Sequence, residues 1–352
     1  MENGSYPFLW ERLKGREVLL YGMGDGADKI FDMCEKYSVN VVGVFASDDF
    51  SSGKTFRGFT VMKRSDALSL YPDAVILLCF AVFRDDMMKN IIELSNVREL
   101  YAPDVAVMGG GLVTPETLRE RSGDIKRFYE KLADDTSRTV LEKLLCYKLS
   151  GNIKPLIECE SDRESDLKKL FDIKNGGYID LGAYRGDTIE EYISIFGEPG
   201  EVYAFEPARV NFRKLYENFG GRENYHLIEA AAYKEDGEIS FSDKSGRGAK
   251  IGGKRTVKCQ RVDSVVKSGA EYIKIDVEGA ELDALEGMKN TIKKSMPYIS
   301  LSAYHRMWDI IDLGLYIAEN YENYEIFLRH HPYIPAWDVM LYMRDKNVGK
   351  QK

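Results

Sequence analysis

The stretch Ile179-Asp180-Leu181-Gly182-Ala183-Tyr184-Arg185-Gly186-Asp187-Thr188 decides how the chain is expected to fold. A short apolar run ends near an acidic residue, a glycine-rich turn follows, and a helical pattern begins directly after the turn. A strand, a tight turn and a helix in this order build doubly wound α/β domains. The carboxylate of Asp180 would repel a pyrophosphate and suits a ligand that carries an ammonium group.

Two interpretations of the start of this helix stay open. Asp187-x-x-Glu190 has the spacing of a capping box, which would make Asp187 the N-cap residue. Alternatively, the helix N-terminus faces the carboxylate of an amino-acid-like ligand, because the first N–H groups of a helix attract anions.

The βα alternation continues after this unit, with strand-like segments at 202–205, 225–228, 272–275 and 298–303. Glu206 follows the first of them, at the position where such folds hold a ribose diol, although a solvated loop acid is the alternative. The small residues Ala230 and Ala231 follow the next and would let a flat adenine ring lie against the backbone. Together these features predict one ligand crevice at the strand ends.

The segment Ile273-Lys274-Ile275-Asp276-Val277-Glu278-Gly279-Ala280-Glu281 places acidic residues after another strand of the same sheet. Ligands of open α/β sheets bind outside the carboxyl ends of the strands, so we expect Asp276 and Glu278 to line the crevice. The two carboxylates also suit Mg²⁺. No third ligand is evident at a matching spacing, and no metal site is predicted.

A second glycine-rich turn, Gly22-x-Gly24-x-x-Ala27, follows an apolar run at 18–21 and opens a helical pattern. This context fits a dinucleotide fingerprint, in which an acidic residue about 20 positions later holds a ribose. Here the acidic residues after the second strand-like run lie a few positions beyond the expected one. Two interpretations therefore stay open: this domain binds a nucleotide, or it is a ligand-free or nucleotide-sugar-like domain.

The 352 residues favour two domains. Strand-like runs at 18–21, 39–45 and 74–83 alternate with helical segments, and from about 112 to 175 the pattern turns helical. We predict a Rossmann-like N-terminal domain over 1–110, a helical connector over 111–175 and a second α/β domain over 176–352. In the last, 239–241 and 256–259 predict a hairpin around a Gly- and Lys-rich stretch, 244–255, which either favours an acidic acceptor or is a solvated loop.

With these motifs in view, the second half of the chain resembles the FkbM family of S-adenosylmethionine-dependent methyltransferases. The matching segments are 179–188, Val-Tyr-Ala-Phe-Glu-Pro at 202–207, 273–281 and Ser-Ala-Tyr-His at 302–305. The likeness extends over about 115 to 345. It implies a class I, seven-stranded methyltransferase fold with an antiparallel last strand, and O-methylation of a hydroxyl on a sugar, glycan or small metabolite. Residues 16–107 resemble Rossmann-like nucleotide-binding domains of sugar-modifying enzymes.

The resemblance also implies roles for single residues. Asp180, Gly182 and Gly186 would line the methionine end of S-adenosylmethionine, Glu206 its ribose, and Asp276 the floor beneath the reacting sulfur. The full set of expected cofactor contacts is Asp180, Gly182, Ala183, Tyr184, Gly186, Asp187, Thr188, Glu206, Pro207, Ala230, Ala231 and Asp276. Tyr184 departs from the wider methyltransferase pattern, which has a glycine there.

Histidine is the best general base near neutral pH, and the chain has four. His305 follows the fifth strand directly and is the preferred catalytic base, with Asp276 second; a structural or substrate-orienting His305 is the alternative. His226 and the pair His330-His331 are placed less well. Acceptor contacts are expected from Glu278, Tyr304 and Arg306.

Rival functions are a nicotinamide-dependent oxidoreductase or a nucleotide sensor that uses the turn at Gly22, Gly24 and Ala27. No Tyr-x-x-x-Lys hydride-transfer pattern accompanies that turn, which argues against the first.

The net charge of −8 argues against nucleic acid as a partner. The longest apolar run, 74–83, is about half of a membrane span, and the N-terminus lacks a signal pattern, so we expect a cytoplasmic protein. Five scattered cysteines indicate neither disulfides nor zinc.

Overall fold

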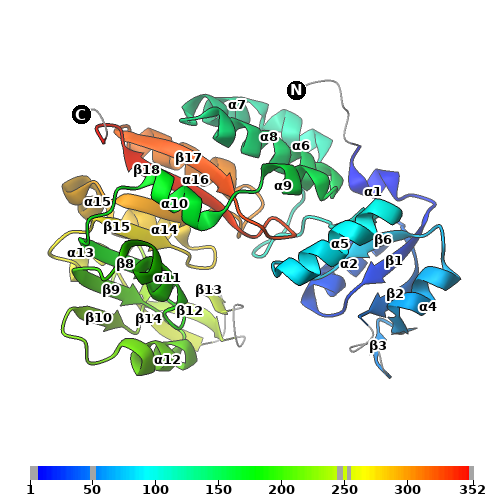
Figure 1. Ribbon diagram of the computed structural model, residues 1–352, viewed down its shortest axis with the longest axis horizontal. Helices are drawn as coiled ribbons and strands as arrows, with labels where there is room; N and C mark the ends of the chain where they lie inside the picture. The colour runs from blue at the N-terminus through cyan, green and yellow to red at the C-terminus, as the bar shows by residue number, and fades with distance from the viewer. Residues whose placement is uncertain (1–6, 48–52, 244–248, 252–254, 349–352) are drawn as a thin grey trace. The chain divides into compact units, whose positions relative to one another are not determined.

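The computed structural model describes residues 7–47, 53–243, 249–251 and 255–348 (Figure 1). The chain divides into two compact units, each assembled from three separate segments. The N-terminal unit comprises Met1–Lys126, Thr136–Glu160 and His330–Asp338, and the C-terminal unit comprises Arg127–Asp135, Ser161–Arg329 and Val339–Lys352.

The N-terminal unit contains a five-stranded parallel sheet in the order β5-β2-β1-β6-β7. Its strands are β1 (Glu17–Tyr21), β2 (Asn40–Ala46), β5 (Met62–Lys63), β6 (Val75–Leu78) and β7 (Leu100–Tyr101). Its other early elements are α1 (Leu9–Arg12), α2 (Asp25–Lys36), β3 (Thr55–Phe56), β4 (Phe59–Thr60), α4 (Arg64–Leu70) and α5 (Asp85–Val97). The doubly wound fold predicted for this region is thereby confirmed, with the strand at 74–83 shortened to four residues.

Segments far along the chain complete this unit. Helices α6 (Pro115–Glu120), α8 (Asp135–Ser150) and α9 (Lys154–Cys159) follow the sheet, and α7 (Ser122–Lys131) lies between α6 and α8. Within 330–338, Ile334 exchanges two backbone hydrogen bonds with Val82, at 2.7 and 2.8 Å. Ile334 is almost fully buried, so this late segment is an integral part of the unit.

The C-terminal unit is built on a seven-stranded sheet in the order β10-β9-β8-β15-β16-β18-β17. Its strands are β8 (Gly177–Leu181), β9 (Glu201–Phe205), β10 (Tyr225–Ile228), β15 (Tyr272–Ile275), β16 (Tyr298–Ser302), β17 (Tyr324–His330) and β18 (Val339–Asp345). The first five pair in parallel, and β18 runs antiparallel to β16 (Figure 1). The helices are α10 (Arg163–Leu170), α11 (Asp187–Phe196), α12 (Arg209–Phe219), α13 (Val262–Val265), α14 (Glu281–Gly287), α15 (Lys289–Ser295) and α16 (Asp309–Asn320).

Aromatic side chains fill one side of this sheet. The rings of Tyr178 on β8 and Tyr272 on β15 stack at 5.3 Å, and Tyr192 of α11 covers Tyr178 at 4.6 Å. Phe171, directly after α10, tilts against Tyr272 at 5.8 Å. Because all four are buried, this packing fixes α10 and α11 against the middle of the sheet and leaves the strand ends to the loops.

A smaller sheet follows β10 in the order β11-β14-β12-β13. Its strands are β11 (Ala231–Ala232), β12 (Gly237–Asp243), β13 (Ala249–Ile251) and β14 (Arg255–Gln260). Strands β12 and β14 pair antiparallel, which confirms the predicted hairpin. Of its basic stretch, 244–248 and 252–254 lie outside the described residues, and the expected effect on the acceptor stays a prediction. Across the residues described, no helix combines the length and apolarity that crossing a membrane requires.

Candidate active site at the strand ends

The loops after β8 and β15 meet at the carboxyl edge of the sheet. Gly182 has a φ of +79°, and a Cβ atom added to it would lie 1.9 Å from the carbonyl oxygen of Asp276. Any side chain at this position would therefore collide with backbone and also strain the left-handed conformation. Glycine is required here because it lets the turn after β8 lie directly against the residue that follows β15.

A buried ion pair supports this contact from below. Lys274 and Asp180 are direct neighbours on the parallel strands β15 and β8. The Lys274 Nζ atom lies 3.3 Å from Asp180 Oδ1 and donates a hydrogen bond to the Gly182 carbonyl at 2.9 Å. Burial raises the pKa of Asp180, and the nearby Lys274 ammonium opposes that rise. Asp180 is fully buried, so its carboxylate holds the turn rather than facing solvent.

The start of α11 differs from the capping-box interpretation. Gly186, with a φ of +95°, is the N-cap residue and offers no side-chain cap, while Asp187 is the first helical residue. The capping box is thus wrong, because the N-cap position falls one residue earlier. Thr188 Oγ1 instead donates a hydrogen bond to Asp180 Oδ2 at 2.6 Å, which ties the first turn of the helix to the end of β8.

Glu206 lies directly after β9, beside the same turn. Its Oε2 atom accepts a hydrogen bond from the Tyr184 N–H at 2.9 Å, and its Oε1 atom accepts one from the Ala208 N–H at 2.8 Å. Only 5% of Glu206 is exposed, which excludes a solvated loop acid. Burial raises the pKa of Glu206 to about 7 against the opposing effect of these backbone donors.

The other residues expected around a cofactor lie along this edge. Ala183 is fully buried under the turn, and Tyr184 has a positive φ of 50°. Pro207 is half-buried beside Glu206. Ala230 and Ala231, both buried, follow β10.

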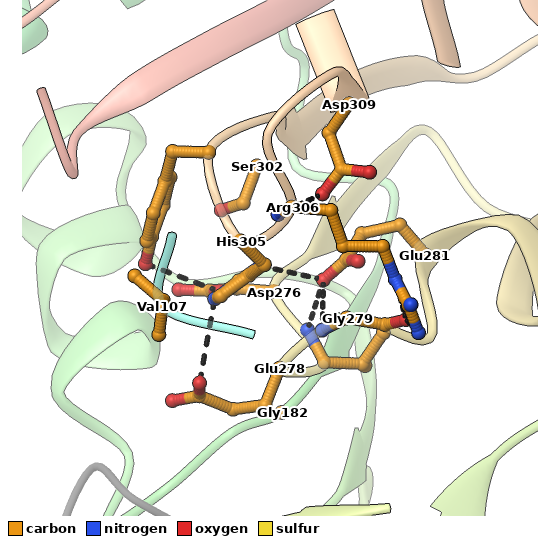
Figure 2. Close-up of polar contacts among 12 residues, drawn as sticks. Val107, Gly182, Asp276, Glu278, Gly279, Glu281, Ser302, His305, Arg306 and Asp309 are labelled. Atoms are coloured by element: carbon orange, nitrogen blue, oxygen red, sulfur yellow. Dashed lines mark hydrogen bonds and ion pairs between the residues drawn. The ribbon is translucent and has the colours of Figure 1, made fainter. Parts of the chain in front are cut away.

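An acidic cluster surrounds His305 where β15 and β16 end (Figure 2). The His305 Nδ1 atom lies 2.9 Å from Glu281 Oε1, and its Nε2 atom lies 3.3 Å from Asp276 Oδ1 and 3.4 Å from Glu278 Oε2. His305 is fully buried, whereas the side chains of Asp276 and Glu278 are 32% and 29% exposed. A ligand at this edge of the sheet would therefore touch these two carboxylates before it touched the imidazole.

The turn that carries Glu278 is held in an unusual conformation. Glu278 has a φ of 54°, which is rare for a residue with a side chain. Glu281 Oε1 fixes the turn by accepting hydrogen bonds from the N–H groups of Val277 and Gly279 at 3.1 and 3.2 Å. Strained backbone held in this way is typical of binding and catalytic sites.

Charges within the cluster shift the titration of its members. Burial opposes protonation of His305, but Glu281, Asp276 and Glu278 outweigh it and raise the pKa of His305 to about 10. Burial, helped by Asp276 and Glu281, raises the pKa of Glu278 to about 7. Burial would also raise the pKa of Asp276, yet Lys274 and His305 together hold it below its usual value.

Tyr304 and Arg306, which flank His305, take different positions. The Tyr304 hydroxyl lies 3.5 Å from Asp276 Oδ1, and its ring packs against the imidazole with centroids 4.2 Å apart. Exposed Arg306 donates from Nε and an Nη atom to the Gly279 carbonyl, at 3.2 and 2.9 Å. Both residues therefore lie at the cluster, where acceptor contacts are expected.

Lys274, Glu281 and Asp309 belong to this region although the site prediction omitted them. Lys274 carried a signal, since it is a charged residue inside an apolar strand whose buried position requires a partner. Glu281 stands in the quoted motif, but nothing in its spacing reveals that it holds the turn. Asp309, whose Oδ2 atom accepts the Arg306 N–H at 2.7 Å, lies only three residues after Arg306, but nothing in its spacing marked it as part of the site.

The remaining histidines lie elsewhere. His226 is 42% exposed and pairs with Glu201 at 3.0 Å, at the opposite end of β9 from Glu206. His330 and His331 are buried and belong to the N-terminal unit, and burial lowers the pKa of His330 to about 4.

Packing accounts for two glycines of the second glycine-rich turn, in the N-terminal unit. A Cβ atom on Gly22 would lie 2.6 Å from the Phe80 ring, and one on Gly26 would lie 2.6 Å from the Cys79 carbonyl oxygen, while Gly24 faces open space. Ala27 is buried beneath the turn. Asp25 and Asp28 place negative charge in the first turn of α2, which disfavours a phosphate there.

Comparison with known proteins assigns the two regions separately. Residues 180–341 match the methyltransferase FkbM domain model, and residues 14–99 match the model described as C2185-like, N-terminal. The hexuronic acid methyltransferase AglP of Haloferax volcanii is 31% identical over 118 residues, 31% of this chain. The match spans about half the length of that relative, 49%.

A solved structure with a high TM-score shows the fold of this chain. A methyltransferase FkbM from Methylobacillus flagellatus KT superposes with a TM-score of 0.72 at 20% identity, covering 95% of this chain and 91% of that one. Fibrillarin of Aeropyrum pernix, solved with bound S-adenosyl-L-methionine, reaches a TM-score of 0.34 at 16% identity over 51% of this chain and 72% of its own. The chain therefore has a Rossmann-like class I fold, and over residues 180–341 it carries a methyltransferase domain of the FkbM family.

Proposed function

We propose that the chain is an S-adenosylmethionine-dependent O-methyltransferase that methylates a hydroxyl of a sugar, a glycan or a small metabolite. The observation that carries this proposal is the contact of Gly182 with the Asp276 carbonyl. It brings a turn suited to the cofactor and a polar cluster suited to an acceptor to the same strand edge.

The residues on the turn fit S-adenosylmethionine. Glu206 offers carboxylate oxygens to a ribose diol from a nearly dry position, where such hydrogen bonds are strong. The α11 N-terminus, with no side-chain cap at Gly186, leaves N–H groups for the amino-acid carboxylate. Asp180 acts indirectly, since Lys274 and Thr188 already occupy it. The proposed contacts are Gly182, Ala183, Tyr184, Gly186, Asp187 and Thr188 at the methionine end, Glu206 and Pro207 at the ribose, Ala230 and Ala231 at the adenine, and Asp276 below the sulfur.

When bound, S-adenosylmethionine supplies a methyl group on a positively charged sulfur. The protein's main task is then to align the acceptor oxygen, and alignment of this kind contributes up to about 7–11 kcal/mol. Asp276 and Glu278 are placed to bind an acceptor hydroxyl, because their carboxylates are the partly exposed members of the cluster. His305 supports them from behind, and Tyr304 and Arg306 border the acceptor.

The proposed substrate class rests on the relative of Haloferax volcanii, which is named as a methyltransferase of a hexuronic acid, the acid form of a sugar. A hydroxyl acceptor suits the cluster better than a carboxylate does. Asp276, Glu278 and Glu281 surround one imidazole, and with no cation bound among them they would repel a carboxylate placed beside them.

Transfer of a labelled methyl group tests the proposal. The full chain is incubated with S-adenosylmethionine carrying a ¹³C-methyl group and with pairs of neutral methyl hexosides and the corresponding hexuronic acids. We expect a methyl ether that survives mild alkali. An alkali-labile methyl ester would refute the hydroxyl assignment while keeping the methyltransferase, and failure of S-adenosylmethionine to bind in calorimetry would refute the proposal as a whole.

A further inference from the structure

Three side chains around the site converge in a way that ligand binding to the turn does not explain. Asp276 follows β15, Glu281 begins α14, and His305 lies in the loop after β16. Each offers one ligand atom, and these atoms lie within 4.8 Å of one another. Figure 2 shows the two carboxylates directed at the imidazole from different sides. Three potential ligands from three elements thus meet at one place.

His305 itself provides a second, independent observation. It is fully buried, and neither ring nitrogen makes a hydrogen bond of acceptable geometry, although carboxylate oxygens lie 2.9 to 3.4 Å away. A buried polar nitrogen without a hydrogen bond is rare and calls for an explanation. Imidazole nitrogens are also the commonest metal ligands in proteins.

The charge of the cluster points the same way. Asp276, Glu278 and Glu281 bring three carboxylates to one imidazole, so negative charge remains in excess whether the ring is protonated or not. Of the nearest cations, Lys274 is paired directly with Asp180 and acts on Asp276 only at longer range, and Arg306 donates to the Gly279 carbonyl and makes no ion pair with the three carboxylates. A divalent cation is the kind of ligand that balances such a group.

We propose that Asp276, Glu281 and His305 form a binding site for a divalent cation. Two carboxylates and one imidazole make a mixed oxygen and nitrogen set, which suits Mn²⁺ or Zn²⁺ better than Mg²⁺ or Ca²⁺. The partial exposure of Asp276 and Glu278 leaves such a site accessible to a further oxygen ligand. The identity of this further ligand rests on the proposed function: it is the acceptor hydroxyl, which a cation would orient and make more acidic.

Direct metal binding tests this site without an acceptor. The full chain is stripped with a chelator and titrated with Mn²⁺ in a calorimeter, with Zn²⁺ and Mg²⁺ in parallel. We expect one strong Mn²⁺ site, weakened by Asp276→Asn or His305→Gln by more than the about 10–100-fold that losing a residue behind a metal ligand costs. The matched control Asp312→Asn, an exposed carboxylate of α16, is expected to bind Mn²⁺ as the unaltered chain does.

A spectroscopic measurement on the unaltered chain guards against variants that fail to fold. Pulsed electron paramagnetic resonance of bound Mn²⁺ is expected to show coupling to one imidazole nitrogen. Absence of Mn²⁺ and Zn²⁺ binding at millimolar concentration, absence of nitrogen coupling, or binding that both folded substitutions leave unchanged would each overturn the site. Methyl transfer that persists in chelator removes the cation's proposed use, whereas Mn²⁺ binding without S-adenosylmethionine binding removes the proposed function and leaves the site.

Discussion

Replacement of Glu206 by glutamine should weaken S-adenosylmethionine binding and remove most of the pH dependence that this carboxylate contributes. The residue is nearly buried, and its two oxygens accept the N–H groups of Tyr184 and Ala208. Hydrogen bonds to a charged group contribute about 1.5–3 kcal/mol, so the dissociation constant is expected to rise about 10- to 150-fold at pH 8.

The pH dependence follows from the pKa of about 7. The carboxyl group is mostly ionised at pH 8 and mostly protonated at pH 6, and a ribose hydroxyl donates only weakly to the protonated form. Affinity should therefore fall about tenfold, or about 1.4 kcal/mol, as pH drops from 8 to 6. Affinity falls at low pH because the Glu206 pKa is raised in the free protein, whereas the hydrogen-bond donors of the bound ribose lower it again in the complex.

Calorimetry at pH 6, 7 and 8 checks both effects. The amino group of S-adenosylmethionine also titrates in this pH range. Glu206→Gln measures the contribution of that amino group alone, because the variant lacks the carboxyl group. Glu201→Gln, at the opposite end of β9, is the matched control and should keep the profile of the unaltered chain. Equal affinity of Glu206→Gln and the unaltered chain at pH 8, with both folded by circular dichroism, would remove Glu206 from the ribose site.

Three substitutions test the architecture behind the site. Lys274→Met leaves Asp180 as a buried charge without its partner, so it should lower the free energy of unfolding in urea titrations by about 3–5 kcal/mol. The control Lys289→Met, on the surface, should change the free energy of unfolding by less than about 0.5 kcal/mol. Gly182→Ala should abolish S-adenosylmethionine binding in calorimetry, because the new Cβ atom meets the carbonyl that follows β15; normal affinity would contradict the close contact. Gly26→Ala should destabilise the N-terminal unit by about 1–3 kcal/mol through overpacking against the end of β6, and an unchanged melting temperature would argue against that packing role.

Much of the fold could be predicted because its strands are short apolar runs bounded by turn residues. The segments at 178–181, 202–205 and 272–275 became β8, β9 and β15, and the strand-end rule placed Glu206 and Asp276 on one edge. That rule needs only the direction of the strands, which βα alternation supplies.

Details that depend on register and on distant partners could not be predicted. Lys274 lies opposite Asp180 because β15 and β8 pair in one particular register, which no local pattern encodes. The capping box failed for a related reason. Gly186 adopts a left-handed conformation that starts α11 one residue early, so Asp187 falls inside the helix despite its favourable spacing to Glu190.

The catalytic prediction shows the same limit. His305 could be selected as the histidine that follows a strand of the sheet, but its complete burial behind Asp276 and Glu278 depends on how three loops pack. The sequence can place a histidine at the carboxyl edge of the sheet. Whether its side chain touches a ligand depends on how far that side chain is exposed, which follows from the packing of the loops.

The interleaved path of the chain has a consequence for the order in which the protein forms during synthesis. The N-terminal unit includes 330–338, where Ile334 completes backbone pairing with Val82. A nascent chain therefore holds the strands of the first sheet long before the ribosome makes the segment that finishes their unit. Domains usually fold in the order of translation. Here the contacts of the earlier unit with residues 330–338 can form only after almost the whole methyltransferase sheet has been made, which links the completion of the two units in time.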